Sequence, residues 1–211
     1  MEEVKNLEEI EVERFSAFDR FVHWLTAIPF VYLFLSGLGM YSPKFAWLLP
    51  LLGGKEFSAW LHKWAGVVFA VGVFLMFLRW AKDFVLDSDD IRWLSNVKHY
   101  IKGEEEKLPE VGKYNAGQKI FGWMVFLGGA LFLITGIVMW FPESFSAKIV
   151  RLSILLHSLA FILVGAGFIV HVYMGTVGVP GSLSGIITGK VSALWAMHHH
   201  PKWFRQIMRR Q

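Results

Sequence analysis

Among its 211 residues the sequence contains no cysteine. This absence excludes disulfide bonds, iron–sulfur ligation and thiolate zinc sites within the chain. It also excludes the C-x-x-C-H attachment of a c-type haem. Any haem bound by this chain must therefore be held without a covalent bond.

Charged side chains are also scarce, at 18% of the residues, whereas 55% of the residues are hydrophobic and the mean hydropathy is +0.45. Four separate apolar runs are each long enough to cross a bilayer, which takes about 20 residues. We predict spans at about 21–41, 61–84, 120–141 and 152–177. The expected fold class is an all-α integral membrane protein, a bundle of four transmembrane helices.

The polar segments divide the rest of the chain. Residues 1–20 hold six glutamates and no apolar core, which predicts an acidic tail with a short interfacial helix and a first span that acts as its own uncleaved signal. The four spans form one membrane domain over 21–177, interrupted by a polar loop at 85–119. Apolar spacing within that loop predicts an interfacial amphipathic helix at 89–102. Residues 178–211 are expected to form a basic, amphipathic tail.

The basic residues indicate an orientation. Four spans place both termini and the 85–119 loop on one side of the membrane. Of the 21 Lys and Arg residues, the opposite side holds only Lys44, Lys55, Lys63, Lys148 and Arg151. The positive-inside rule therefore predicts that both termini are cytoplasmic.

Two histidines, His157 and His171, lie within the last span. A separation of fourteen residues turns a helix by four turns less about 40°, so both rings lie on nearly one face, about 21 Å apart along the axis. Ionisable or polar rings at membrane depth are costly and usually mark a functional site.

Two further histidines match these depths. His23 begins the first span at the cytoplasmic side, near the level of His171, and His62 begins the second span at the outer side, near the level of His157. Two imidazoles on different helices at one depth can bind the two axial positions of a haem iron. The pattern favours two bis-histidine b haems, an outer one on His62 and His157 and an inner one on His23 and His171.

Other interpretations of these histidines remain open. Singly, each could be an interfacial residue or a hydrogen-bonding partner between helices. Jointly, they could form a metal or proton transporter. Such a site usually adds carboxylates to neutralise a dication, and the interiors of the four spans contain none.

Small residues and the remaining histidines carry weaker signals. Gly37 could leave room for a large group or only allow close helix packing, and the same alternatives hold for the seven-residue repeat of Gly122, Gly129 and Gly136. The similar segments FLSG and LITG in the first and third spans are too short to count as a repeat. His99 is expected to be solvated, and so are the three histidines at 198–200, with metal binding as the alternative for those three.

Six motifs together resemble the gamma (cytochrome b) subunit of membrane-bound, quinone-linked formate dehydrogenases. They are FDRFVHW around His23, LHKWAG around His62, VGKYNAGQK at 111–119, LLHS around His157, HVYM at His171 and GKVSALWAMHHHPKW at 189–203. The histidine pattern is shared with related cytochromes b of nickel–iron hydrogenases and thiosulfate reductases, which stay as alternatives. The motifs at 111–119 and 189–203 are more specific to the formate dehydrogenase subunit.

The resemblance implies the same two haem ligand pairs, His62 with His157 and His23 with His171. It implies an electron-transferring subunit of an oxidoreductase in a prokaryotic cytoplasmic membrane, without a formate-oxidising site of its own. The implied partners are an iron–sulfur beta subunit, a molybdenum or tungsten alpha subunit and membrane lipid, with no nucleic acid.

The resemblance also implies a menaquinone or ubiquinone site beside the inner haem, at Asn115, Gly117, Gln118 and His171. Amide side chains suit a neutral ring because they offer donors without a charge. The alternative is that Asn115 caps the third span, with Gln118 three residues later as its partner. The two roles are compatible with each other.

Overall fold

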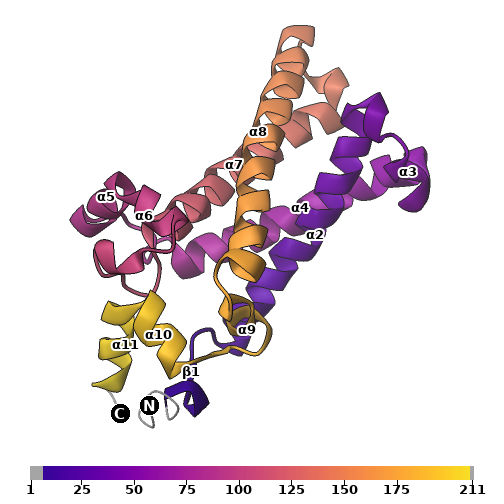
Figure 1. Cartoon of the computed structure of the whole chain (residues 1–211). Helices are drawn as coiled ribbons and strands as arrows, with labels where there is room; N and C mark the ends of the chain where they lie inside the picture. The colour runs from indigo at the N-terminus through magenta and orange to yellow at the C-terminus, as the bar shows by residue number, and fades with distance from the viewer. Residues whose placement is uncertain (1–6, 210–211) are drawn as a thin grey trace. The chain divides into compact units, whose positions relative to one another are not determined.

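Four long α-helices make up most of the chain. A computed structural model describes residues 7–209, so Glu2, Glu3, Lys5 and Arg210 of the predicted tails lie outside the described residues. The long helices are α2 (Ala17–Tyr41), α4 (Lys55–Trp80), α7 (Ala116–Trp140) and α8 (Ala147–Tyr173), which Figure 1 shows as the longest ribbons.

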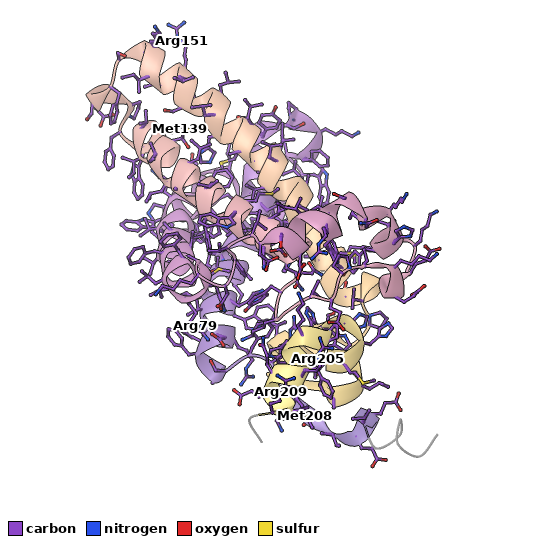
Figure 2. All side chains as sticks on the ribbon, turned by 90° about the vertical axis from the view of Figure 1, so that its left-hand side faces the viewer. Arg79, Met139, Arg151, Arg205, Met208 and Arg209 are labelled. Carbon is purple, nitrogen blue, oxygen red and sulfur yellow. The ribbon has the colours of Figure 1, made fainter. Side chains whose placement is uncertain are left out.

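All four helices are long and apolar enough to cross a membrane. Each contains an 18-residue window with a mean hydropathy between 1.6 and 2.3, and only 17% to 28% of the residues in each window are buried. The side chains therefore stand outward along the helices (Figure 2), as lipid-facing residues do. The predicted all-α class with four membrane-spanning helices is confirmed.

Each helix begins earlier than its predicted span. The starts at 17, 55, 116 and 147 precede the expected starts at 21, 61, 120 and 152, and α4 ends at Trp80 rather than at 84. The first turns hold polar or charged residues, such as Asp19 in α2 and Glu56 in α4. Hydropathy excludes such residues from a span, although a helix accepts them in its first turn.

Short elements connect the long helices. After α2 come a 3-10 turn, η1 (Pro43–Phe45), and α3 (Leu48–Leu51), and η3 (Pro142–Ser144) separates α7 from α8. Gly53 and Gly54 both have positive φ, at 95° and 94°, and turn the chain between α3 and α4.

Residues 21–79 and 124–170 form one compact unit, which we call the four-helix unit. Glycines allow its helices to approach closely, as small residues do in membranes. A Cβ built on Gly72 would meet Thr26 Oγ1 at 2.5 Å, and one on Gly129 would meet Val73 Cγ1 at 2.9 Å. Gly129 therefore serves helix packing, which was one of the two predicted roles for the glycine repeat.

The remaining described residues form a second compact unit, the terminal unit, from residues up to 20, 80–123 and 171 onward. Its elements are β1 (Glu11–Glu13), α5 (Ser88–Ser95), α6 (Val97–Ile101), η2 (Glu105–Lys107), the π-helix η4 (Met174–Gly178), α9 (Ser182–Ile187), β2 (Lys190–Ser192), α10 (Ala193–His199) and α11 (Pro201–Met208). Arg205 and Met208 mark α11 in Figure 2. A core of Val12, Val179, Val191, Trp195 and Trp203 holds the unit together.

Two predictions about the polar segments were wrong. Residues 11–13 form an antiparallel pair with β2, with Val12 opposite Val191, instead of belonging to a solvated tail. The predicted helix over 89–102 is two helices, α5 and α6, which Asn96 separates. The side-chain nitrogen of Asn96 donates to the Arg92 carbonyl, which ends α5 there.

Candidate functional site

His62 and His157 each contact a hydroxyl group on another helix of the four-helix unit. His62 lies on α4, and its Nδ1 is 2.8 Å from Ser36 Oγ on α2. His157 lies on α8, and its Nδ1 is 2.8 Å from Thr135 Oγ1 on α7. The two histidines are therefore held in the same way by separate helices.

The direction of these two hydrogen bonds follows from the other bonds of the hydroxyls. Ser36 Oγ donates to the Tyr32 carbonyl at 2.7 Å, and Thr135 Oγ1 donates to the Leu131 carbonyl at 2.6 Å. A hydroxyl has a single hydrogen, so while that hydrogen bonds the helix carbonyl the oxygen accepts from the imidazole. Nδ1 consequently carries the proton on both rings, and Nε2 is left with a lone pair, the form in which histidine binds metal.

Glycines stand beside both rings. A Cβ on Gly37 would lie 3.6 Å from His62 Cε1 and 3.8 Å from Phe161 Cε2, and a Cβ on Gly136 would lie 3.9 Å from His157 Cε1. Phe161, one turn after His157 on α8, thus lies next to Gly37, as the His62 ring does. The absence of side chains at both glycines leaves room next to the Cε1–Nε2 edges.

The chemistry of this donor set fits a haem. Two neutral imidazoles with protonated Nδ1 atoms are suited to axial ligation, and small and aromatic residues line the neighbouring space. Among residues 7–209, no group of three or more His, Asp or Glu side chains is arranged to hold a metal ion.

The other two predicted haem ligands belong to different compact units, and their pairing stays a prediction. His23 is half-buried on α2, with its ring edge-on to Trp24 at a centroid distance of 5.3 Å. His171 lies in the terminal unit, where its ring stacks on Phe121 of α7 at 4.6 Å and 14°.

The predicted quinone-site residues form the start of α7. The Asn115 backbone N–H donates to Gln118 Oε1 at 3.0 Å, and the Gln118 N–H donates to Asn115 Oδ1 at 2.9 Å. This reciprocal pair is a helix capping box, as the alternative interpretation expected. The cap uses only the amide oxygens, so the NH₂ groups can serve another partner. Gly117 and Gln118 are exposed, whereas Asn115 is buried.

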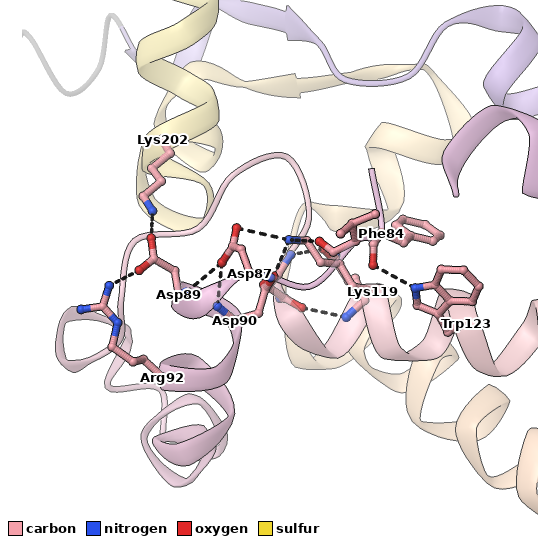
Figure 3. Close-up of polar contacts among 11 residues, drawn as sticks. Phe84, Asp87, Asp89, Asp90, Arg92, Lys119, Trp123 and Lys202 are labelled. Carbon is pink, nitrogen blue, oxygen red and sulfur yellow. Dashed lines mark hydrogen bonds and ion pairs between the residues drawn. The ribbon is translucent and has the colours of Figure 1, made fainter. Parts of the chain in front are cut away.

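A pocket of about 540 Å³ adjoins this segment in the terminal unit, between α5, the 110–114 loop, the start of α7 and α11. Asp90 and Lys119 form a buried ion pair at 2.5 Å on its wall, with 4% and 9% of their surfaces exposed. Figure 3 shows this pair next to Asp87, whose side chain caps α5. Backbone hydrogen bonds, chiefly from Asp90, lower the pKa of Asp87.

Asp89 lies nearby and joins α5 to α11. It accepts hydrogen bonds from Lys202 and from Arg92, and these two partners lower the pKa of Asp89 (Figure 3). His99, which was expected to be solvated, instead pairs with Glu104 at 2.6 Å. The hydrogen bond from His99, followed by one from Lys107, lowers the pKa of Glu104.

Arg14 and His200 form a buried contact that joins both ends of the chain to the 111–115 segment. Arg14 Nη2 donates to the Lys113 carbonyl at 3.1 Å and lies 3.0 Å from His200 Nε2. His200 Nδ1 donates to the Gly112 carbonyl at 2.7 Å. The Arg14 guanidinium also lies 4.6 Å from the Trp195 ring centroid, within cation–π range. The expectation that His200 is solvated was therefore wrong.

Burial disfavours a charge on either residue. Desolvation lowers the pKa of Arg14 to about 10. Burial, and then the adjacent Arg14 charge, hold the pKa of His200 well below its ordinary value of 6.5. Arg14 therefore donates to a neutral His200 at neutral pH.

This arrangement predicts a loss of stability in acid. Below about pH 6.5 the unfolded chain protonates His200 while the folded chain does not, so the unfolded state binds more protons and the free energy of unfolding falls. We expect the thermal unfolding midpoint to drop between about pH 7.5 and about pH 5.5, and to drop less in His200→Gln. The matched control is His198→Gln, at an exposed position. An equal drop in all three proteins would contradict the prediction.

Sequence reasoning missed Ser36 and Thr135. The only signal was the similarity between FLSG and LITG, in which each hydroxyl residue directly precedes Gly37 or Gly136. That similarity is too short to stand out in a single sequence. The structure shows that both segments contact a histidine in the same way.

Comparisons with known proteins add independent support. The family described as prokaryotic cytochrome b561 matches residues 14–189. The cytochrome b556(Fdn) subunit of nitrate-inducible formate dehydrogenase from Escherichia coli (strain K12) is 38% identical over 192 residues, covering 90% of this chain and 88% of the relative. The formate dehydrogenase cytochrome b556(fdo) subunit of the same strain is 33% identical over 199 residues, 93% of each chain. The formate dehydrogenase cytochrome b556 subunit of Haemophilus influenzae is 37% identical over 191 residues, 89% of this chain and 79% of the relative.

Proposed function

Because the chain belongs to the prokaryotic cytochrome b561 family, we propose that it is the cytochrome b subunit of a membrane-bound formate dehydrogenase and passes electrons to a quinone. The observation that carries this proposal is the matched pair His62 and His157, each with its Nδ1 proton held by a hydroxyl group. The relatives that are formate dehydrogenase subunits supply the identity of the complex.

Four histidines hold two b haems in this proposal. His62 and His157 ligate the outer haem, which the hydroxyl contacts support. His23 and His171 ligate the inner haem, which rests on their matched depths in the sequence and on the family resemblance. Haems bound by these histidines would supply single-electron transfer.

The remaining chemistry of the complex lies in partner chains. This chain contains no cysteine, so the iron–sulfur centres belong to a beta subunit and formate oxidation to a molybdenum or tungsten alpha subunit. The basic residues around both termini favour a cytoplasmic location for the terminal unit, in the cytoplasmic membrane of a prokaryote. The electron donor is therefore expected at the opposite, outer face.

The quinone site is proposed at Asn115, Gly117, Gln118 and His171. Quinone reduction consumes protons, so the ring carbonyls need donors close to cytoplasmic water. The capping box supports this role because it leaves the amide NH₂ groups available. The stacking of His171 on Phe121, three residues beyond Gln118, brings the first turns of α7 next to that histidine.

Replacing the amides by carboxylates tests the quinone site separately from the cap. Asn115→Asp and Gln118→Glu keep the acceptor oxygens of the capping box but remove the NH₂ donors. We expect both haems to remain bound, while quinone reduction by the formate dehydrogenase complex falls by at least about tenfold, or about 1.4 kcal/mol. Asn115→Leu and Gln118→Leu should lose the same activity and also weaken the start of α7.

The outcome distinguishes the two roles of these residues. Normal quinone kinetics in the carboxylate variants, with reduced stability only in the leucine variants, would leave Asn115 and Gln118 as a helix cap alone. A reduced-minus-oxidised optical spectrum of the wild-type protein is the reference for all variants. A spectrum without b-type haem bands would contradict the proposed function itself.

A further inference from the structure

We propose that Ser36 and Thr135 are positioning residues that fix His62 and His157 as ligands of the outer haem and lower its reduction potential. This inference rests on the proposed function, since it concerns the haem assigned above to those two histidines. It goes further by assigning a role to two hydroxyl groups that do not themselves bind the iron.

Burial and hydrogen bonding fix the orientation of both hydroxyls. Ser36 and Thr135 are 0% and 2% exposed. The hydrogen of each hydroxyl is directed to the carbonyl one turn earlier, with a second carbonyl, Leu33 or Phe132, 3.4 Å away. Rotating either hydroxyl to donate to the imidazole would break its own hydrogen bond to that carbonyl, which contributes about 0.5–1.5 kcal/mol.

The acceptor role of the hydroxyls fixes the tautomer of the rings. A neutral histidine with a proton on Nε2 would present a bare Nδ1 to an oxygen that has no hydrogen to give. The tautomer with the proton on Nδ1 satisfies both groups at 2.8 Å. Both rings are therefore prepared to offer Nε2 as a ligand before any iron binds.

The same bonds tune the ligands. An acceptor at Nδ1–H raises the electron density of the ring and makes Nε2 a stronger donor, which stabilises ferric more than ferrous iron. A neutral hydroxyl is a weaker acceptor than the carboxylate that often occupies this position. The two hydroxyls should thus lower the potential moderately, and their removal should raise it.

Redox titration of the purified complex, followed by the optical bands of the haems, tests this inference. Ser36→Ala and Thr135→Val remove the acceptors and keep small side chains at both positions. We expect each variant to raise the midpoint potential of the outer haem, corresponding to about a tenfold change in the ratio of ferrous to ferric affinity, or about 59 mV for one electron. The inner haem should keep its potential and serves as an internal reference.

Conservative and matched variants separate positioning from packing. Ser36→Thr and Thr135→Ser keep a hydroxyl and should restore the wild-type potential. Ser158→Ala is the matched control. Ser158 directly follows His157 in the sequence, and its hydroxyl donates to the Ile154 carbonyl one helical turn earlier. That variant should leave the outer potential unchanged.

Two failures can be told apart. If Ser36→Ala, Thr135→Val and their double variant keep the outer haem at an unchanged potential, the positioning role is wrong while the ligand assignment stands. If the wild-type protein lacks a haem that depends on His62 and His157, the proposed function fails instead. Loss of the outer haem in the double variant, with recovery in Ser36→Thr/Thr135→Ser, would support the positioning role.

Discussion

Replacing His62 with alanine is expected to remove one of two haems from the protein. The haem content measured by the pyridine haemochrome assay should fall from about two non-covalent b haems per chain to about one, because a single remaining imidazole cannot complete bis-histidine ligation of the outer haem. His157→Ala should give the same result. The inner haem should remain reducible by added quinol, while electrons from the formate-oxidising partner no longer enter.

His99→Ala is the control for this experiment, since His99 pairs with Glu104 in the terminal unit. It should retain both haems. If His62→Ala instead removed the haem that quinol reduces and kept the one that the donor reduces, the predicted orientation in the membrane would be inverted. Unchanged haem content in both His62→Ala and His157→Ala would disprove the ligand assignment.

Asp90→Asn is expected to destabilise the protein most strongly among variants of the terminal unit. The substitution removes the carboxylate charge next to the buried Lys119 ammonium. Among the described residues, Lys119 then keeps the Val85 carbonyl at 3.2 Å and one carboxylate, that of the exposed Asp87, at 3.8 Å. Removing one partner of a buried ion pair lowers the free energy of unfolding by about 3–5 kcal/mol. Because Lys119 keeps other contacts, we expect a loss at the lower end of this range, about 3 kcal/mol. The measurement is the thermal unfolding midpoint of the purified protein.

The double variant Asp90→Asn/Lys119→Met should recover most of the lost stability, because no uncompensated charge stays buried. Asp89→Ala, which removes a surface carboxylate paired with Lys202 and Arg92, should change the midpoint only slightly. An effect of Asp90→Asn no larger than that of Asp89→Ala would show that the buried pair contributes little.

The four long helices could be predicted because the requirements that lipid places on a membrane span apply to a short stretch of sequence. A span must satisfy its own backbone hydrogen bonds and be apolar over about 20 residues, and both properties are visible in a short window of sequence. The first turns of α2 and α4 were left out of the predicted spans because they contain the charged residues Asp19 and Glu56. Their helical state depends on charge at a helix terminus and not on hydropathy.

The contacts of the terminal unit could not be predicted, because they join residues far apart in the chain. Arg14 and His200 are separated by 186 residues, and β1 and β2 are three residues each. No local pattern identifies a partner over such a distance, so the charged Arg14 and the histidine-rich 198–200 segment both resembled solvated surface. The hydroxyls of Ser36 and Thr135 were missed for the same reason, since their partners lie on other helices.

A hydroxyl residue, a glycine and a histidine recur in both helical hairpins of the four-helix unit. In α2 with α4 the hydroxyl and the histidine are 26 residues apart, and in α7 with α8 they are 22 apart. Each helical hairpin thus contains one hydroxyl residue, one glycine and one histidine in the same arrangement. Each histidine therefore takes its orientation from a contact within its own hairpin, and that orientation does not depend on how the two hairpins pack against each other.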